Sequence, residues 1–421
     1  MKIAFHTFGC KVNLVETENL KLKASEEGYE YVPDLEDADI IVINSCAVTD
    51  KAEKKTLQYL RRIKSKFPNK KIAVTGCMAE LKKDDLGVDF VITNAGKDEI
   101  FKYISNRSNF LTPIDTLDHY RENYSTGLMD KTRGFLKIQD GCDEFCSYCI
   151  IPFLRGKPRS KPIQNIVDEF SILLQKGFKE IVLVGIHIGK YGLDINSSIY
   201  ELLLKLTSFE GKYRIRLSSI EINELTDELI SLIVNNNNIC KHLHIPLQSA
   251  SDKILQLMGR KYNYEYFIRK IKEIKKLSPF ITIGSDIIVG FPGETEEDFS
   301  QIYDNIYNSP LDYLHVFPYS KREGTKAANM NNQIDEHTKH YRSEKLRELS
   351  DAKKFNSAKK FFGKEIEVLT EKNSKGLTEH YFEVTFLHNN IEPNRFVKTK
   401  IVGITFDGNL IGKIIEEVLW V

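Results

Sequence analysis

The sequence predicts an α/β protein in three parts: a doubly wound parallel α/β domain, a partial (β/α)6 barrel and a small all-β barrel. Three observations predict this order. Short β-branched, apolar runs alternate with helical stretches in residues 1–112, as they do in parallel sheets. Six further runs follow from residue 134, each before helical or connecting sequence. After Gly363 the chain changes to short strand-like runs with Gly, Asn and Pro turns.

Residues 1–112 form the first predicted domain. Its apolar runs are KIAFHTF, DIIVINS, KIAVTG and FVIT, with helical stretches at 15–27 and 51–67 between them. Buried parallel strands joined by helices give a doubly wound sheet. Such a sheet binds ligands at the carboxyl ends of its strands.

Residues 128–356 form the second predicted domain, after a polar connector at roughly 112–132. The sequence predicts strands at 134–141, 180–187, 214–221, 242–249, 282–290 and 313–320, and helices at 162–176, 199–208, 226–235, 251–277 and 295–308. Six βα units predict a parallel, right-handed array that curls into a partial barrel. Its site should lie at the carboxyl ends of the strands.

Residues 357–421 form the third predicted domain. A long, strongly charged helix at 335–362 precedes it, and the strand-like runs are EIEVLTE, HYFEVTFL, RFVKTKIVGITF and NLIGKIIEEVLWV. Several short strands with turn residues between them predict a small β-barrel.

Composition narrows the class of protein. Lys plus Arg number 60 against 59 acidic residues, so the net charge is +1 and a polyanion site must come from local clustering. The N-terminal sequence shows no signal-peptide pattern, and no run of about 20 apolar residues predicts a membrane span. We therefore expect a cytoplasmic protein whose seven cysteines are reduced and serve metal binding or catalysis.

One group of cysteines is the C-x3-C-x2-C run Cys142, Cys146 and Cys149. Three thiolates at this spacing can hold three irons of a cubic iron–sulfur cluster and leave the fourth open for a reactant. A zinc knuckle or redox thiols are the alternatives. Zinc would require a fourth Cys or His nearby, and the nearest histidines are His119 and His187. The spacing favours the cluster.

A second group is spread along the first predicted domain. Cys10, Cys46 and Cys77 follow the apolar runs in HTFGC, INSC and VTGC. The carboxyl ends of parallel strands meet at one edge of a sheet, so these thiols are expected to converge. The alternative is three buried cysteines that act as small apolar residues.

Taken together, these motifs resemble the radical S-adenosylmethionine (SAM) methylthiotransferases over nearly the whole chain. The motifs FGCKVN, KIQDGCDEFCSYCIIP, HIPLQS, DIIVGFPGETEEDF and LHVFPYSKREGT look like the branch that acts on N6-threonylcarbamoyladenosine in tRNA. The isopentenyladenosine branch usually carries GCQMN, and the ribosomal-protein aspartate branch GCPKN, where this chain has GCKVN at 9–13.

The resemblance implies two [4Fe-4S] clusters, one on Cys142, Cys146 and Cys149 and one on Cys10, Cys46 and Cys77. The first would bind SAM and cleave it to a 5′-deoxyadenosyl radical, and the second would hold the sulfur to be transferred. It also implies SAM contacts by Gly185, Ser219, Glu221 and Gly290, a central radical SAM core, and a C-terminal TRAM (OB-like) barrel of an RNA-binding type that contains Tyr381, Phe382 and Phe386. Phe382 and Phe386 share one face of a strand and are expected to lie in the core of that barrel.

The same resemblance implies that a tRNA anticodon loop is the substrate and that carbon 2 of its modified adenosine 37 receives the methylthio group. It further implies a low-potential electron donor such as flavodoxin or ferredoxin, and we expect a monomer. Candidate phosphate contacts are the helix at 51–71 and two basic groups, Lys353, Lys354, Lys359 and Lys360, and Arg155, Lys157, Arg159 and Lys161. Any of these runs can instead be a solvated surface.

Two other interpretations of the sequence remain open at this point. One is a methylthiotransferase acting on isopentenyladenosine tRNA or on a ribosomal-protein aspartate. The other is an RNA-binding or iron-storage protein whose clusters have structural roles. Cys240, His242 and His244 are expected to be structural.

Overall fold

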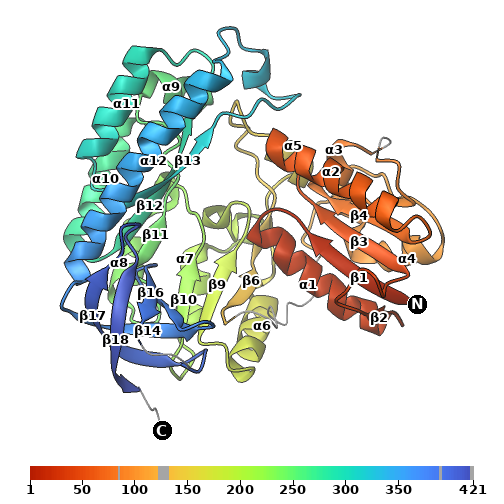
Figure 1. Ribbon diagram of the computed structural model, residues 1–421, viewed down its shortest axis with the longest axis horizontal. Coiled ribbons are helices and arrows are strands. Elements are labelled where there is room, and N and C mark those ends of the chain that lie inside the picture. The colour runs from red at the N-terminus through yellow and green to blue at the C-terminus, as the bar shows by residue number, and fades with distance from the viewer. Residues whose placement is uncertain (84–85, 122–131, 388–390, 418–421) are drawn as a thin grey trace.

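The computed structural model describes residues 1–83, 86–121, 132–387 and 391–417. Its three parts follow one another along the chain, with the N-terminal domain beside the central barrel and the small C-terminal barrel below the latter (Figure 1). The predicted fold class is confirmed in each part. Within the described residues, no helix combines the length and the apolar character that a membrane crossing needs.

The N-terminal domain is a five-stranded parallel sheet in the order β2-β1-β3-β4-β5. Its strands are β1 (Lys2–Thr7), β2 (Glu30–Tyr31), β3 (Ile40–Ser45), β4 (Lys71–Gly76) and β5 (Phe90–Val91), and its helices are α1 (Lys11–Glu26), α2 (Asp50–Lys66), α3 (Cys77–Leu81) and α4 (Ile100–Ser105). Separate apolar cores cover the two faces, one including Leu60 of α2 and the other Leu20 of α1. The sheet is therefore doubly wound.

The first helix begins earlier than the predicted residue 15. Cys10 is its N-cap in an extended conformation, and the helix starts at Lys11. The first cysteine therefore lies at the junction of a strand and a helix, with little chain between them.

Six parallel strands build the central part in two sheets, β6-β9-β10 and β11-β12-β13. The strands are β6 (Gly134–Lys137), β9 (Glu180–Val184), β10 (Arg214–Leu217), β11 (His242–His244), β12 (Thr282–Val289) and β13 (Tyr313–Pro318). A parallel bridge between Ile215 and Ile239 joins the sheets. The array is the predicted partial barrel, with its core between strands and outer helices.

Helices cover the outside of this array (Figure 1). They are α6 (Ile163–Gln175), α7 (Ile199–Leu206), α8 (Asp227–Asn235), α9 (Asp252–Met258), α10 (Tyr264–Leu277), α11 (Glu296–Asn308) and α12 (Glu336–Ala358). Between β6 and α6 lie the hairpin strands β7 (Gln139–Asp140) and β8 (Arg159–Ser160) and the short helix α5 (Ile151–Arg155). Short 3-10 helices span Asn94–Glu99, Ile114–Thr116, Ile188–Lys190, Leu193–Ile195, Ile222–Glu224, Lys326–Asn329 and Lys359–Phe361.

The prediction of one helix over 251–277 is wrong. Helix α9 ends at Met258, where Gly259 takes a left-handed conformation with φ +76°. Asn263 then caps α10 by accepting a hydrogen bond of 2.8 Å from the backbone N–H of Tyr266. A left-handed glycine is a common helix end. The break between the two helices places Arg260 beside the thiol of Cys146.

The C-terminal part is a closed barrel in the order β14-β15-β16-β18-β17. Its strands are β14 (Glu365–Glu371), β15 (Lys375–Thr378), β16 (Glu383–Phe386), β17 (Phe396–Ile404) and β18 (Leu410–Glu417). Phe382 and Phe386 are buried in its core. Tyr381 instead stacks on His242 of the central barrel, with ring centroids 4.4 Å apart. Its ring is thus engaged between the two barrels.

Candidate active site

Cys10, Cys46 and Cys77 lie together at one edge of the N-terminal sheet. They follow β1, β3 and β4, which are neighbours in the sheet. Between β1 and β3 the strand order reverses, and such a switch point opens a crevice at the strand ends. Burial raises the pKa of both Cys46 and Cys77, and the nearby thiol of Cys10 raises both further. We call these three residues the N-terminal triad.

Two glycines allow this close approach. Gly9 has φ +104°, and a Cβ on it would lie 2.8 Å from Cβ and 3.1 Å from Sγ of Cys46. Gly76 has φ +89°, and a Cβ there would lie 2.5 Å from the carbonyl oxygen of Ser45. A side chain at either position would therefore push the cysteine-bearing segments apart.

Cys142, Cys146 and Cys149 lie in the loop between β7 and α5, and we call them the central triad. The loop is folded on itself because the N–H of Cys142 donates to the carbonyl of Gly156 and that of Cys149 to the carbonyl of Cys146, both at 2.9 Å. All three cysteines are half-buried residues. Arg260 Nη1 lies 3.3 Å from Sγ of Cys146, and His187 Nδ1 lies 3.5 Å from Sγ of Cys142.

The chemistry of both triads fits an iron–sulfur cluster. Burial raises the pKa of Cys77 to about 11 and that of Cys149 to about 12, so iron must displace protons to bind there. Among the described residues, no three His, Cys, Asp or Glu side chains lie close enough to share a single metal ion. The thiolates of a cubic cluster bind different irons and stand further apart than ligands of one ion.

A pocket of about 420 Å³ opens beside the central triad. Its lining includes Cys146, Glu221, Arg260, Tyr262, His187 and Glu224. Arg260 pairs with Glu221, and burial is the main cause that raises the pKa of Glu221. His187 Nε2 lies 2.5 Å from Glu224. Burial opposes the charged imidazole, but Cys142 and Glu224 raise the pKa of His187 to about 10. The pocket is large enough for one small ligand.

The other residues predicted to contact SAM are placed around the strand ends. Gly185 follows β9, where a Cβ would lie 3.0 Å from the carbonyl oxygen of Gln139. Ser219 follows β10 and its hydroxyl lies 2.8 Å from His244 Nδ1. A Cβ on Gly290 would lie 2.4 Å from Cγ of Lys339, so this side chain fills the room beside the glycine. Only Glu221 of the four lines the pocket.

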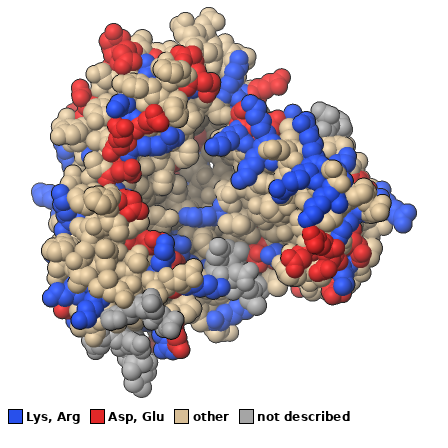
Figure 2. Space-filling view, viewed as in Figure 1, with Lys and Arg blue, Asp and Glu red and all other residues tan. Residues whose placement is uncertain are grey.

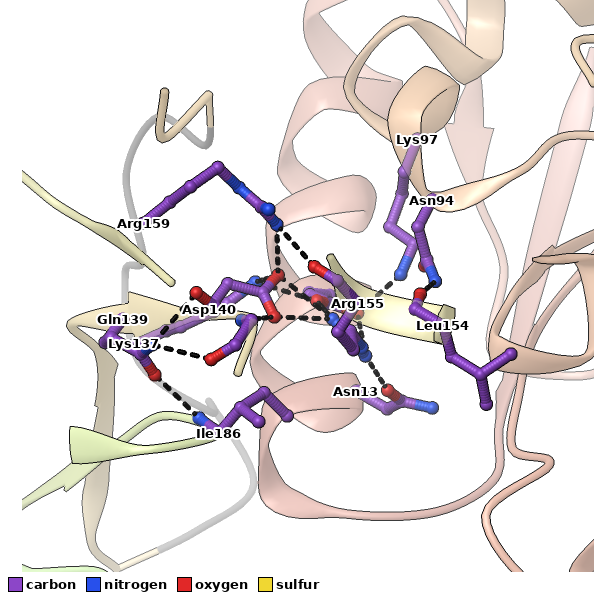
Figure 3. A network of polar contacts seen from close by, with 12 residues as sticks. Asn13, Asn94, Lys97, Lys137, Gln139, Asp140, Leu154, Arg155, Arg159 and Ile186 are labelled. Carbon is purple, nitrogen blue, oxygen red and sulfur yellow. Dashed lines mark hydrogen bonds and ion pairs between the residues drawn. The ribbon is translucent and has the colours of Figure 1, made fainter. Parts of the chain in front are cut away.

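A buried polar network crosses from the N-terminal domain to the segment that carries the central triad (Figure 3). Glu16 of α1 pairs with Lys97 at 2.6 Å and with Lys137 of β6 at 2.8 Å. Arg155, at the end of α5, pairs with Glu16 and lies 3.2 Å from Asp140. Burial alone would raise the pKa of Glu16, but these cations hold it well below its usual range. The network thus couples the sheet domain to the loop of the central triad.

This network corrects one prediction about nucleic acid. Arg155, Arg159 and Lys161 are buried, and Lys161 pairs with Glu169 at 2.8 Å. They cannot reach a phosphate group, so of that run only Lys157 stays exposed. Among the other lysines named for this role, Lys353 donates to the carbonyl of Ser309 and Lys354 to the side chain of Asn409. By contrast, α2 exposes Lys51, Lys55, Arg61 and Arg62.

Sequence reasoning missed three residues of this region. Arg260 follows a helix break within the predicted 251–277 helix. Asn13 and Glu16 lie on the buried side of α1. None of the three carried a clear sequence signal, because polar and apolar residues are mixed on the buried face of α1.

Two protein-family models match this chain, one in the N-terminal domain and one in the central barrel. Residues 2–94 match the uncharacterized protein family UPF0004, and residues 136–306 match the radical SAM superfamily. The threonylcarbamoyladenosine tRNA methylthiotransferase MtaB of Bacillus subtilis is 38% identical over 438 residues, covering 99% of this chain and 97% of that protein. The tRNA-2-methylthio-N(6)-dimethylallyladenosine synthase of Thermoanaerobacter pseudethanolicus is 35% identical, covering 97% and 88%.

The solved structure of the radical SAM methyltransferase TsrM from Kitasatospora setae matches with a TM-score of 0.58 and 13% identity, over 78% of this chain and 77% of that one. At that identity the likeness concerns the fold alone. The near full-length relatives carry the assignment: this chain belongs to the radical SAM methylthiotransferases.

Proposed function

We propose that this enzyme methylthiolates carbon 2 of N6-threonylcarbamoyladenosine at position 37 of tRNA. The observation that carries the proposal is the joining of the two cysteine triads through one buried network. The 38% identical relative from Bacillus subtilis is named for this substrate. The relatives named for dimethylallyladenosine are 34–35% identical, which makes that substrate the second candidate.

Each triad has a distinct role in this proposal. Cys142, Cys146 and Cys149 would hold a [4Fe-4S] cluster, as the radical SAM family implies, and Cys10, Cys46 and Cys77 would hold a second. When bound, the clusters and SAM supply a carbon radical and a sulfur donor, chemistry that belongs to the cofactors. An aromatic C–H is too weak an acid for a side-chain base, so a radical is needed to remove this hydrogen. The protein then has to hold the two triads at a fixed separation and keep water away from the radical.

The pocket beside the central triad is the proposed SAM site. Glu221 and Arg260 lie within it and are paired with each other, so they can exchange this contact for the ammonium, carboxylate or ribose hydroxyls of SAM. Gly185 and Ser219 extend the site to the neighbouring strand ends. The contact of Gly290 with adenine stays a prediction.

The inner face of the barrel carries polar side chains that a substrate base would meet. Alternate residues of β11, β12 and β13 face inward, including His244, Asp286 and His315, and His244 Nε2 lies 3.2 Å from Asp286. Lys11, directly after Cys10, is exposed, and its charge acts on His242 and His315 of β11 and β13. Burial lowers the pKa of His315, and the charges of His244 and Lys11 lower it further. We propose that Lys11 meets the threonyl carboxylate.

The anticodon loop would approach over α2. Figure 2 shows Lys and Arg side chains gathered on the N-terminal domain beside the hollow that separates it from the barrel. Exposed cations on α2 include Lys51, Lys55 and Arg61. A loop base can be unstacked without opening a long duplex, so it can enter such a hollow. A flavodoxin or ferredoxin as electron donor, a monomeric state and a cytoplasmic location complete the proposal.

The test uses anaerobically reconstituted enzyme, dithionite, SAM and tRNA that carries threonylcarbamoyladenosine. We expect 5′-deoxyadenosine and the 2-methylthio nucleoside by mass spectrometry. Replacing the N-terminal triad by alanine should preserve SAM cleavage and abolish the product, whereas Cys142→Ala should abolish both. A product with isopentenyladenosine tRNA or with a ribosomal-protein aspartate alone would reassign the substrate. Absence of SAM cleavage would favour a structural role for the clusters.

A further inference from the structure

The side chain of Arg155 crosses from the loop of the central triad into the N-terminal domain. Arg155 ends α5, six residues after Cys149, and is 1% exposed. Its Nη2 donates to Oδ1 of Asn13 at 2.5 Å, while Nη1 contacts Glu16 and lies 3.2 Å from Asp140 (Figure 3). The planar guanidinium therefore holds an acceptor of one domain and a carboxylate of the other at fixed angles.

Asn13 links Arg155 to the backbone beside two cysteines of the N-terminal triad. Its Nδ2 donates to the carbonyl of Phe8 at 2.8 Å and to the carbonyl of Ser45 at 3.0 Å. These carbonyls lie two residues before Cys10 and one residue before Cys46. Because the amide oxygen faces Arg155 and the amide nitrogen faces both segments, the orientation of Asn13 is set from both sides.

The third cysteine segment joins through Ser45. The Ser45 hydroxyl donates to the carbonyl of Thr75, and it accepts from the N–H of Met78 at 3.2 Å. Thr75 and Met78 flank Cys77. A continuous chain of hydrogen bonds therefore runs from α5 to the backbone beside every cysteine of the N-terminal triad.

The other end of the network fixes the central triad. Asp140 Oδ1 accepts from the N–H of Gly141 at 2.8 Å, and Gln139 Nε2 donates to the carbonyl of Gly141 at 2.8 Å. Gln139 Oε1 also accepts from the N–H of His187 at 2.8 Å. The residue before Cys142 and the strand end beside the SAM pocket are thus held by the same group of side chains.

We propose that Arg155 is a positioning residue that sets the separation of the two cysteine triads and so couples SAM cleavage to sulfur delivery. This inference rests on the proposed function for its chemical consequence. The reacting groups lie on separate domains, and a misplacement of about 1 Å can cost on the order of 100-fold in rate. With a shifted N-terminal triad, SAM would still be cleaved, but 5′-deoxyadenosine would form without the methylthio product.

The experiment compares Arg155→Lys with Arg159→Lys. Lysine keeps the charge at 155 but lacks the fork that reaches Asn13 and Glu16 together. Arg159 is a matched control, since it is a buried arginine beside Arg155 whose contacts stay within the central segment: it bonds the carbonyls of Arg155 and Lys157 and lies 3.8 Å from Asp140, a distance that lysine can also span. Asn13→Asp is the second variant, because it keeps an acceptor for Arg155 and removes the donors to Phe8 and Ser45.

Three quantities are measured: iron per protein, 5′-deoxyadenosine per methylthio nucleoside, and hydrogen exchange of the apoprotein over 8–16 and 44–49. We expect Arg155→Lys and Asn13→Asp to keep the iron content. Both variants should raise the amount of 5′-deoxyadenosine formed per methylthio nucleoside at least about tenfold and should speed hydrogen exchange in both segments. Arg159→Lys should change none of these.

An unchanged ratio and unchanged exchange in Arg155→Lys would overturn the inference, as would loss of iron from the N-terminal triad, which would assign Arg155 to cluster retention. Wild-type enzyme in the same assay distinguishes failure of the proposed function from failure of the positioning role of Arg155. If it cleaves SAM and makes no methylthio nucleoside, the proposed function fails, while the exchange data still decide whether Arg155 positions the N-terminal segments.

Discussion

We expect Glu16→Gln to destabilise the apoprotein by about 3 kcal/mol. Glu16 is 2% exposed and pairs with Lys97, Lys137 and Arg155. Removing one partner of a buried ion pair costs about 3–5 kcal/mol because the remaining charge is left uncompensated. The lower value applies here, since glutamine still accepts a hydrogen bond and Asp140 stays close to Lys137 and Arg155.

The assay is chemical unfolding of the apoprotein followed by circular dichroism. Glu26→Gln is the matched control, because Glu26 lies on the same helix and is exposed. An exposed charge of this kind should change stability by less than about 0.5 kcal/mol. If Glu16→Gln unfolds at the same denaturant concentration as the control, the network does not carry the interdomain stability assigned to it.

The same contact makes stability depend on pH. Burial would raise the pKa of Glu16, but Arg155, Lys137 and Lys97 hold it well below the ordinary value of about 4.3. The stabilising contribution is therefore complete above about pH 4.3 and is lost as the pH falls through the folded-state pKa. Since glutamine resembles the protonated acid, the stability difference between wild type and Glu16→Gln should shrink steadily as the pH falls below about 4.3. A difference that stays constant on acidification would contradict this.

Three further predictions concern the ligands. Arg260→Met should lower the rate of 5′-deoxyadenosine formation at least about tenfold, because Arg260 contacts Cys146 and Glu221; an unchanged rate in a cluster-loaded variant would place SAM elsewhere. Lys11→Gln should reduce kcat/KM for threonylcarbamoyladenosine tRNA by about tenfold and leave isopentenyladenosine tRNA unaffected, and equal reductions on both would argue against a carboxylate contact. Lys55→Ala with Arg61→Ala should lower the slope of log affinity for tRNA against log salt by roughly 0.7 for each phosphate that these cations neutralise, and an unchanged slope would move the RNA surface away from α2.

The sequence predicted the parts of the site that local pattern encodes. Each cysteine of the N-terminal triad follows a run of apolar, β-branched residues, and parallel strand ends meet at one sheet edge. Convergence was therefore predictable from three separate segments. The central triad was predictable from spacing alone, because a short loop must bring its thiols together.

What sequence could not provide is the set of contacts between elements far apart in the chain. Arg155 is one of several candidate phosphate contacts by sequence because a run of cations resembles an anion site, and nothing local reveals that Glu16, 139 positions away, neutralises it. The break at Gly259 was missed because apolar periodicity resumes directly in α10. A single left-handed glycine overrode a helical pattern on both sides.

The charged character of the network explains how two separate domains can keep two triads in register. Apolar surfaces tolerate small displacements, since burial depends on area and has no direction. Buried ion pairs and bidentate hydrogen bonds do not tolerate such displacements, because a shifted partner leaves a charge unpaired at a cost of several kcal/mol. The contacts of Glu16 and Arg155 are of this kind, and their geometry constrains the segments that carry Cys10 and Cys46. A domain interface that must define a reaction distance is better built from directional contacts than from a wider apolar surface, and the exchange and coupling measurements on Arg155→Lys test that reasoning directly.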